Sequence, residues 1–161
     1  MTTIKTILFT IFLVMGVVTV GVPYLLLGSR WRLPISIGSF HWPGLLLIVA
    51  GALIYLWCAW EFTTRGKGTP APIDPPKRVV TTGLYRYTRN PMYVGVSSVL
   101  FGEALFFQSG GLLIYAVLVT LGFHLRVLYY EEPVLRQSFG AAFDEYCRAV
   151  PRWLPRSKPT N

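Results

Sequence analysis

The sequence predicts an all-α integral membrane protein with about four transmembrane helices and a C-terminal amphipathic helix. Three observations support this: the apolar residues form long runs, the positive charges cluster between some of these runs, and one polar segment has helical periodicity. The chain has 161 residues, of which 53% are hydrophobic and 14% charged, with a formal net charge of +8. At this length we expect a single domain covering residues 1–161.

The collection of the apolar residues into long runs excludes several other classes of protein. It argues against a soluble globular enzyme, a disordered tail and a secreted disulfide scaffold. The two cysteines, Cys58 and Cys147, could form one disulfide at most. Because Cys58 lies in an apolar run and Cys147 in a polar one, we expect free thiols.

The predicted spans are residues 7–27, 44–60, 92–107 and 112–130, with 21, 17, 16 and 19 residues. A hydrocarbon core about 30 Å thick needs roughly 20 helical residues, with a lower limit near 17. The third run is short and contains Glu103, so we expect it to cross as half of a hairpin with the fourth. A cleaved signal peptide is the less favoured interpretation of the first run, which is too long and lacks a small-residue cleavage pattern.

The basic residues concentrate between the second and third spans and after the fourth. These residues are Arg65, Lys67, Lys77, Arg78, Arg86, Arg89, Arg136, Arg148, Arg152, Arg156 and Lys158. The segment between the first two spans contains only Arg30 and Arg32, and the connector 108–111 has no charge. The positive-inside rule therefore predicts cytoplasmic termini and a cytoplasmic basic loop. Anionic lipid head groups account for the basic surface, so no nucleic-acid partner is expected.

Two polar segments complete the predicted layout. The cytosolic loop, residues 61–91, is rich in proline and glycine over residues 66–76, which excludes regular helix there and favours a stiff loop. Residues 133–150 place their apolar side chains on one helical stripe, and Pro133 suits the first turn of a helix. We expect an amphipathic helix along the membrane surface or over the bundle.

Polar side chains gather at the cytosolic edge of the predicted hairpin. Because the connector is short, residues of the third and fourth spans whose numbers sum to about 219 lie at one depth. The side chains near this depth are Tyr85, Arg89, Asn90, Tyr93, His124, Arg126, Glu131 and Glu132. Ionisable groups at such a depth are costly and tend to be paired or functional. The sequence therefore predicts a polar pocket at the cytosolic interface.

Each of these side chains also has a simpler interpretation. Arg126 could extend to the lipid head groups, Glu131 and Glu132 could stabilise a helix N-terminus, and His124 could be a hydrogen-bonded packing residue. The tyrosines could form an interfacial aromatic belt. The convergence of so many polar groups at one depth favours a site. Glu103, about 12 Å nearer the outer face, is a structural partner in the bundle or a contact for a substrate tail.

Signatures of several other chemistries are absent from the sequence. It has no glycine-rich phosphate loop of the Walker or dinucleotide type. The two histidines, His41 and His124, are far apart and on opposite sides of the predicted membrane, so we expect no metal site. No serine has a partner base nearby, which leaves a hydrolase triad without support.

Two motifs carry a family resemblance. The first is Gly83–Gly95, and the second runs from Glu131–Leu135 to Val150–Pro155. Both resemble the integral-membrane methyltransferases, the isoprenylcysteine carboxyl methyltransferase and phospholipid methyltransferase group. A proline-rich stretch, 68–77, is similar to that of small bacterial members, so the likeness covers about residues 66–155.

This resemblance implies a helical membrane enzyme that binds S-adenosylmethionine on its cytosolic side. It would methylate a lipophilic or amphiphilic acceptor, bearing a carboxylate, amine or thiol, that arrives through the bilayer. The family usually has Arg-His-Pro where this chain has Arg89-Asn90-Pro91. Since an asparagine can hydrogen-bond but cannot titrate near neutral pH, Asn90 keeps a binding role only.

The chemistry of such a cofactor assigns roles to the polar residues. The candidate cofactor-binding residues are Tyr85, Arg89, Asn90, Pro91, Tyr93, Glu131 and Glu132. Arg89 or Arg126 suits the cofactor's carboxylate, a glutamate suits its ribose hydroxyls and ammonium, and a tyrosine suits its adenine or sulfonium. Pro91 breaks the third helix and lets the preceding backbone face the ligand.

The candidate catalytic residues are His124, Arg126 and Arg152. His124 would orient the acceptor or take its proton, and Arg152 would clamp an anionic acceptor. Two other functions stay open: an NADPH-dependent membrane reductase of the sterol-reductase type, which resembles the C-terminal motif, and a non-catalytic scaffold that retains the fold. The oligomeric state stays open as well.

Overall fold

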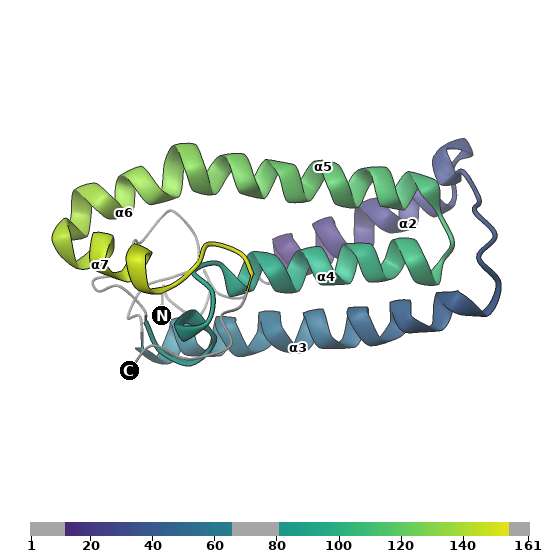
Figure 1. Ribbon diagram of the computed structural model, residues 1–161. Coiled ribbons are helices and arrows are strands. Elements are labelled where there is room, and N and C mark those ends of the chain that lie inside the picture. The colour runs from purple at the N-terminus through teal and green to yellow at the C-terminus, as the bar shows by residue number, and fades with distance from the viewer. Residues whose placement is uncertain (1–11, 66–80, 155–161) are drawn as a thin grey trace.

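The computed structural model describes residues 12–65 and 81–154 of the chain. Over these ranges the chain is helical, and the one β-type pairing is an isolated bridge between Pro34 and Ser109. The long helices lie alongside one another, and the last short helix before the C-terminus folds back at one end (Figure 1). The predicted all-α fold class is therefore confirmed. The expected start of the first span at residue 7 and the proline-rich segment 66–76 lie outside the described residues.

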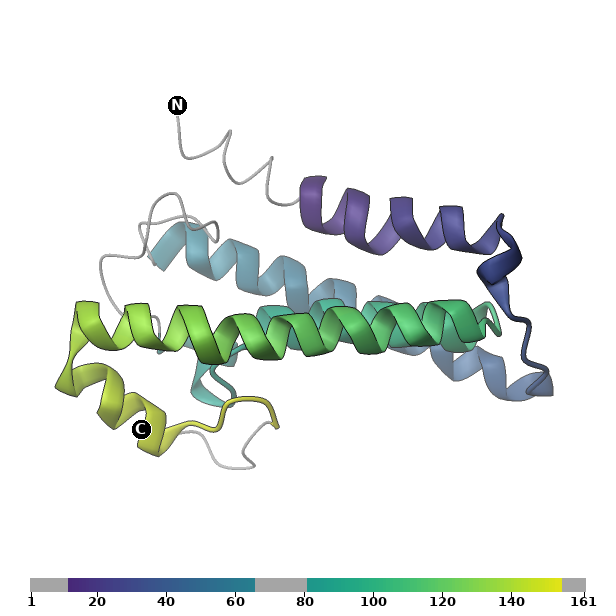
Figure 2. The ribbon, with the colours of Figure 1, turned by 90° about the horizontal axis from the view of Figure 1, so that it is seen from above.

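The first predicted span ends where the sequence predicts. A π-helical stretch, η1 (Phe12–Gly21), continues directly into α2 (Val22–Leu27). Pro23 stands in the first turn of α2, where its ring is tolerated. The chain then turns through two short 3-10 helices, η2 (Arg30–Arg32) and η3 (Gly38–His41), at the end of the bundle opposite the C-terminal helices (Figure 2).

Three longer helices form the rest of the bundle: α3 (Trp42–Arg65), α4 (Pro91–Phe106) and α5 (Gly110–Arg126). By length and composition, Trp42–Glu61 and the continuous helix Gly110–Phe139 can each cross a membrane, and the helices Gly16–Leu27 and Pro91–Phe106 are shorter but apolar. The predicted loop boundary at residue 61 is wrong, because α3 continues to Arg65. After the apolar run ends at Trp60, no glycine or proline occurs until residue 66, so the helix extends past that run.

Glycines bring α3 and α4 into backbone contact. A Cβ atom added at Gly51 would lie 2.5 Å from the carbonyl oxygen of Gly95, and one added at Gly44 would lie 2.6 Å from that of Gly102. The glycines are spaced by seven residues on both antiparallel helices, so they meet in two matched pairs. Small residues allow this close approach between membrane helices. We expected α4 to depend on its hairpin with α5, but its closest packing is against α3.

A short connector joins α4 to α5 as predicted. The Ser109 hydroxyl donates a hydrogen bond to the carbonyl of Arg32 at 2.6 Å and accepts one from the Leu112 amide at 3.3 Å. Between the helices, Thr120 Oγ1 donates to Ser97 Oγ at 3.0 Å. This pair lies two residues from the predicted register, so the levels of the two helices agree with the prediction to within one turn.

The single helix predicted over residues 133–150 is wrong. Two helices occupy this region, α6 (Glu132–Phe139) and α7 (Ala141–Ala149), and Gly140 between them has a φ of +52°. This left-handed conformation favours glycine and lets α7 fold back along the bundle. A π-helical turn, η5 (Val127–Glu131), joins α5 to α6 without a break, directly before the proline in the first turn of α6.

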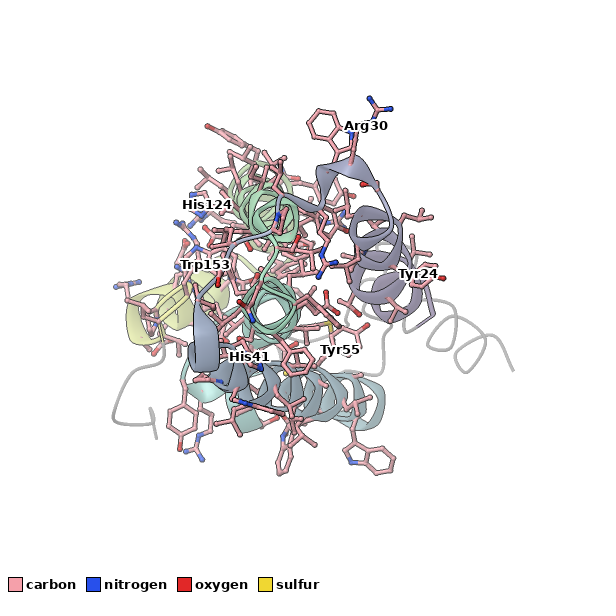
Figure 3. The ribbon with its side chains drawn as sticks, turned by 90° about the vertical axis from the view of Figure 1, so that its right-hand side faces the viewer. Tyr24, Arg30, His41, Tyr55, His124 and Trp153 are labelled. Carbon is pink, nitrogen blue, oxygen red and sulfur yellow. The ribbon has the colours of Figure 1, made fainter. Side chains whose placement is uncertain are left out.

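The interior of the bundle contains a small apolar cluster contributed by α3, α4 and α5. Its fully buried members are Tyr55, Val96, Leu100 and Ala116. The large apolar side chains on the outer faces of α3 and α5 are exposed, and Figure 3 shows side chains extending outward all around the helices. An apolar exterior of this kind suits a lipid environment.

Candidate functional site

Hydrogen bonds join residues 88–90 to residues 151–152 at the end of the bundle that carries α6 and α7, here called the site end. The Arg89 amide donates to the carbonyl of Pro151 at 2.9 Å. The Thr88 hydroxyl and the Asn90 side-chain amide both donate to the carbonyl of Arg152, each at 3.1 Å. Asn90 stands just before Pro91, the first residue of α4, so the start of this helix is tied to the C-terminal segment.

Glu132, at the start of α6, binds two arginines. Arg152 donates to both of its carboxylate oxygens, from Nε at 2.7 Å and from Nη2 at 2.9 Å. Arg89 Nη1 lies 3.0 Å from Oε1 of the same carboxylate. Two guanidiniums and one carboxylate leave this cluster with one net positive charge. We call Arg89, Glu132 and Arg152 the arginine cluster.

Two of the three side chains of the arginine cluster are largely buried. The side chains of Arg89 and Glu132 are only 12% and 10% exposed. Burial alone would raise the pKa of the Glu132 carboxyl, but the hydrogen bond from Arg152 and the charge of Arg89 lower that pKa below its ordinary value. The same hydrogen bond raises the pKa of Arg152. Glu132 is therefore ionised at neutral pH.

Arg89 also has an unused donor. Its Nη1 donates to the sulfur of Cys147, in α7, at 2.7 Å. Its Nε, in contrast, is buried and has no hydrogen-bond partner within residues 12–65 and 81–154. Both cysteines are free thiols, as predicted. A spare buried N–H in a cluster with net positive charge is suited to an anionic ligand.

Glu131 forms a second polar group. The hydroxyl of Tyr93 and Nε of Arg126 both donate to its Oε1, the latter at 2.8 Å. The Tyr93 ring stacks on Phe123 with ring centroids 4.6 Å apart, and the Arg126 guanidinium lies 5.7 Å from the centre of the Tyr130 ring. This group is more exposed than the arginine cluster and lies where α5 continues into α6.

His124 lies beside Trp153 of the C-terminal segment (Figure 3). The indole Nε1 of Trp153 is 3.0 Å from Nδ1 of His124, and the ring centroids are 5.8 Å apart. Arg152, the residue before Trp153, belongs to the arginine cluster. The C-terminal segment therefore contacts both the arginine cluster and His124.

Most of the side chains that the sequence singles out do meet at the site end. They fall into three parts. The first is the arginine cluster with Asn90, the second is the group of Tyr93, Arg126 and Glu131, and the third is His124. Pro91 is buried at the start of α4. Tyr85 differs, because it is 8% exposed and packed in the core, where its carbonyl accepts a hydrogen bond from Tyr146. No group of potential metal ligands occurs among the described residues.

Four further residues at the site end were not among the sequence candidates. Tyr146 and Trp153 belong to the second motif, which was a usable signal, whereas nothing in the sequence distinguished Cys147. Glu61, in the last two turns of α3, is buried beside Gly83, and a Cβ added at Gly83 would collide with the Glu61 carboxylate. Gly83 has a φ of +57°, so both its conformation and its surroundings require glycine.

Fold and site together define a class of protein: a bundle of apolar membrane helices with a charged, partly buried cluster of side chains at one end. The family model described as phospholipid methyltransferase matches residues 39–142 of the chain. Because this match covers more than half of the sequence, the chain belongs to the phospholipid methyltransferase family, and the predicted resemblance is confirmed. Comparisons with curated proteins and with solved structures found no match. Family membership indicates a membrane methyltransferase.

Proposed function

We propose that the chain transfers a methyl group from S-adenosylmethionine to a lipophilic or amphiphilic acceptor at the cytosolic membrane interface. The observation that carries this proposal is the arginine cluster, which has one net positive charge and a buried, unused N–H on Arg89. The cofactor is zwitterionic, and its carboxylate needs such a partner. Guanidinium groups bind carboxylates with well-defined geometry.

The residues at the site end fit the cofactor in specific ways. Arg89 and Arg152 would bind its carboxylate, while Glu132, already hydrogen-bonded to both, would hold the two guanidiniums in position. Both Tyr93 and Arg126 donate to Oε1 of Glu131, and within residues 12–65 and 81–154 its second oxygen has no hydrogen-bond partner, so it could accept from ribose hydroxyls or an ammonium. We leave Tyr85 out of the proposed contacts because it is packed in the core.

S-adenosylmethionine would supply a methyl group on a sulfonium, which a nucleophilic atom of the acceptor takes by in-line displacement. The protein contributes by positioning the reactants and excluding water from them. The ring of Tyr93, held by Phe123 and Glu131, is suited to contact a cation. Arg126 would position Glu131 through its hydrogen bond to the carboxylate. The Arg126 side chain itself is about half exposed.

The orientation of the protein is part of the proposal. With the site end in the cytosol, the arginines of the site and of α6 and α7 obey the positive-inside rule, and both termini are cytoplasmic. A bacterial inner membrane agrees with this arrangement. An acceptor with a carboxylate, amine or thiol would then reach the site from the bilayer, and a phospholipid is the first acceptor to test, given the family.

Binding to the purified full-length chain in lipid nanodiscs tests this function. A thermal shift with S-adenosylmethionine, S-adenosylhomocysteine and NADPH side by side should show stabilisation by the first two only. Tritium from the labelled methyl group should then appear in lipid extracted from nanodiscs that contain phosphatidylethanolamine. Stabilisation by NADPH alone would point to the reductase, and no response to any of the three compounds would point to the scaffold.

A matched pair of variants tests the site. Arg89→Ala should weaken binding of S-adenosylhomocysteine by at least about tenfold, since it removes a charge-assisted hydrogen bond from a buried site. Arg30→Ala removes the same kind of residue at the opposite end of the bundle and should bind normally. Equal affinities for the two variants would show that the arginine cluster is not the cofactor site.

A further inference from the structure

The hydrogen bond between Trp153 and His124 has only one possible direction. An indole nitrogen always donates, so Nδ1 of His124 accepts at 3.0 Å. A neutral imidazole that accepts at Nδ1 carries its proton on Nε2. Within residues 12–65 and 81–154, Nε2 of His124 has no hydrogen-bond partner. The free nitrogen of this histidine is thus an N–H donor.

We infer that Trp153 is a positioning residue that fixes His124 as an Nε2–H donor, so that His124 binds an acceptor through a carboxylate or phosphate oxygen. This inference rests on the proposed function and narrows it. Of the two roles that the sequence leaves open for His124, orienting the acceptor agrees with the geometry. Taking a proton at Nε2 does not, because that nitrogen is already protonated in this tautomer.

The backbone of the C-terminal segment connects this histidine to the arginine cluster. The guanidinium of Arg152 donates a hydrogen bond to Glu132, and the carbonyl of Arg152 accepts hydrogen bonds from Thr88 and Asn90. Trp153 is the next residue, so its indole is held by the same anchors. An oxygen with negative charge beside an N–H donor also benefits from the net positive charge of the neighbouring cluster. The ligand chemistry is therefore an oxyanion on an amphiphile.

The other histidine provides an internal control. Nδ1 of His41 lies 2.6 Å from the carbonyl oxygen of Gly38, at the opposite end of the bundle (Figure 3). A carbonyl oxygen only accepts, so Nδ1 of His41 donates and carries the proton. The two histidines of this chain should therefore have opposite tautomers when they are neutral.

Nitrogen-15 NMR of histidine in the full-length protein measures both tautomers directly. At alkaline pH in nanodiscs, we expect protonated Nε2 and unprotonated Nδ1 for His124, and the reverse for His41. His41→Gln assigns the signals. A His124 signal from the Nδ1–H tautomer, or from a mixture of both, would overturn the inference without any other variant. This result does not depend on whether S-adenosylmethionine binds.

Trp153→Phe removes the donor and keeps an aromatic ring. We expect the ratio of the two His124 tautomers to shift toward a mixture by roughly threefold to tenfold, the range of one ordinary hydrogen bond. Trp57→Phe, at an exposed position on α3, should leave the ratio unchanged. An unchanged ratio in Trp153→Phe would show that the indole does not set the tautomer.

Two single-chain amphiphiles test the ligand chemistry of His124. Dodecyl phosphate should shift the Nε2 signal of His124 in the wild-type protein, and this shift should shrink at least threefold in Trp153→Phe. Dodecyltrimethylammonium, with the same chain and a cationic head, should leave the signal in place. Equal shifts with both amphiphiles, or none with the phosphate, would overturn the assignment of an oxyanion ligand.

Discussion

Glu132 is the residue on which the geometry of the site depends most. It holds Arg89 from the segment before α4 and Arg152 from the C-terminal segment, so one carboxylate joins three parts of the chain. Removing one partner of a buried ion pair leaves uncompensated charge and typically costs about 3–5 kcal/mol. Arg152 is 29% exposed, which reduces this cost for its half of the interaction.

We expect Glu132→Gln to lower the free energy of unfolding by about 3 kcal/mol at neutral pH. It should also change the pH dependence of stability. The pKa of Glu132 is lowered in the folded protein, so its contribution is fully present above the ordinary pKa of a carboxyl and is lost as the pH falls through the lowered pKa. Wild-type protein should therefore lose more stability than Glu132→Gln on acidification from about pH 6 to pH 3.

Denaturant unfolding in detergent, followed by tryptophan fluorescence, measures this difference at each pH. Asp144→Asn is the control, since Asp144 forms an exposed ion pair with Arg136 and should change stability by less than about 1 kcal/mol. Parallel pH profiles for wild type and Glu132→Gln would contradict the assigned role of this carboxylate.

The sequence predicts which polar residues share a depth, but not how they pair. Helical rise alone predicts that Arg89, Glu131 and Glu132 lie at one depth. In the structure Arg89 and Glu132 are in contact. The contacts of Arg152 and Trp153 could not be predicted in this way. They depend on the path by which the chain returns after α7, and the rise along a helix contains no information about that path.

At the scale of elements, the contact between α3 and α4 is made by backbone rather than by large side chains. Gly51 meets Gly95, and Gly44 meets Gly102, at distances that leave no room for a methyl group. Since apolar side chains gain little from leaving lipid, close backbone packing of this kind is what holds membrane helices together. This contact fixes α4, and thereby positions Asn90 and Tyr93 at the site.

Gly51→Ala should destabilise the protein by about 1–3 kcal/mol, because the new methyl group forces two backbones apart. Gly122→Ala is the matched control: this glycine of α5 has nothing within 4 Å of an added Cβ, and alanine favours helix by up to about 1 kcal/mol. In thermal unfolding in detergent, the midpoint of Gly51→Ala should lie below that of wild type and the midpoint of Gly122→Ala above it. A Gly51→Ala midpoint equal to or above that of wild type would show that the helices do not pack as described.

The sequence predicts helices reliably here and their breaks less well. Long apolar runs determine where helices lie. The ends of α4, and of α5 taken together with η5, differ from the predicted ends by no more than two residues. The break at Gly140 was missed because the apolar stripe continues across it at helical spacing. The pairing of α3 with α4 was also missed, although the seven-residue spacing of glycines on both helices was a visible signal.

At the scale of the whole molecule, the bundle has one charged end and one end with few charges. The arginine cluster, the Glu131 group and His124 all lie at the site end, while Arg30 and Arg32 lie in the turn at the opposite end. The proposed orientation in the membrane rests on this asymmetry, and it sets the side from which the proposed cofactor would reach the site.

Cysteine labelling tests the orientation. With a membrane-impermeant maleimide on intact spheroplasts, Arg30→Cys should be labelled and Arg148→Cys should be labelled only after the membrane is disrupted. The native thiols provide the background, since Cys58 is buried and Cys147 is half-buried at the site end. Labelling of Arg148→Cys from outside, with Arg30→Cys protected, would reverse the orientation and move the proposed site to the other side of the membrane.

Isothermal titration calorimetry of S-adenosylhomocysteine into the full-length protein in nanodiscs tests the central claim most directly. We predict binding to wild type at one site per chain, binding at least about tenfold weaker to Arg89→Ala, and wild-type affinity for Arg30→Ala, a substitution at the opposite end of the bundle. Absence of binding to folded wild-type protein, or equal affinity in wild type and Arg89→Ala, would contradict the account of this protein as a methyltransferase whose cofactor is held by the arginine cluster.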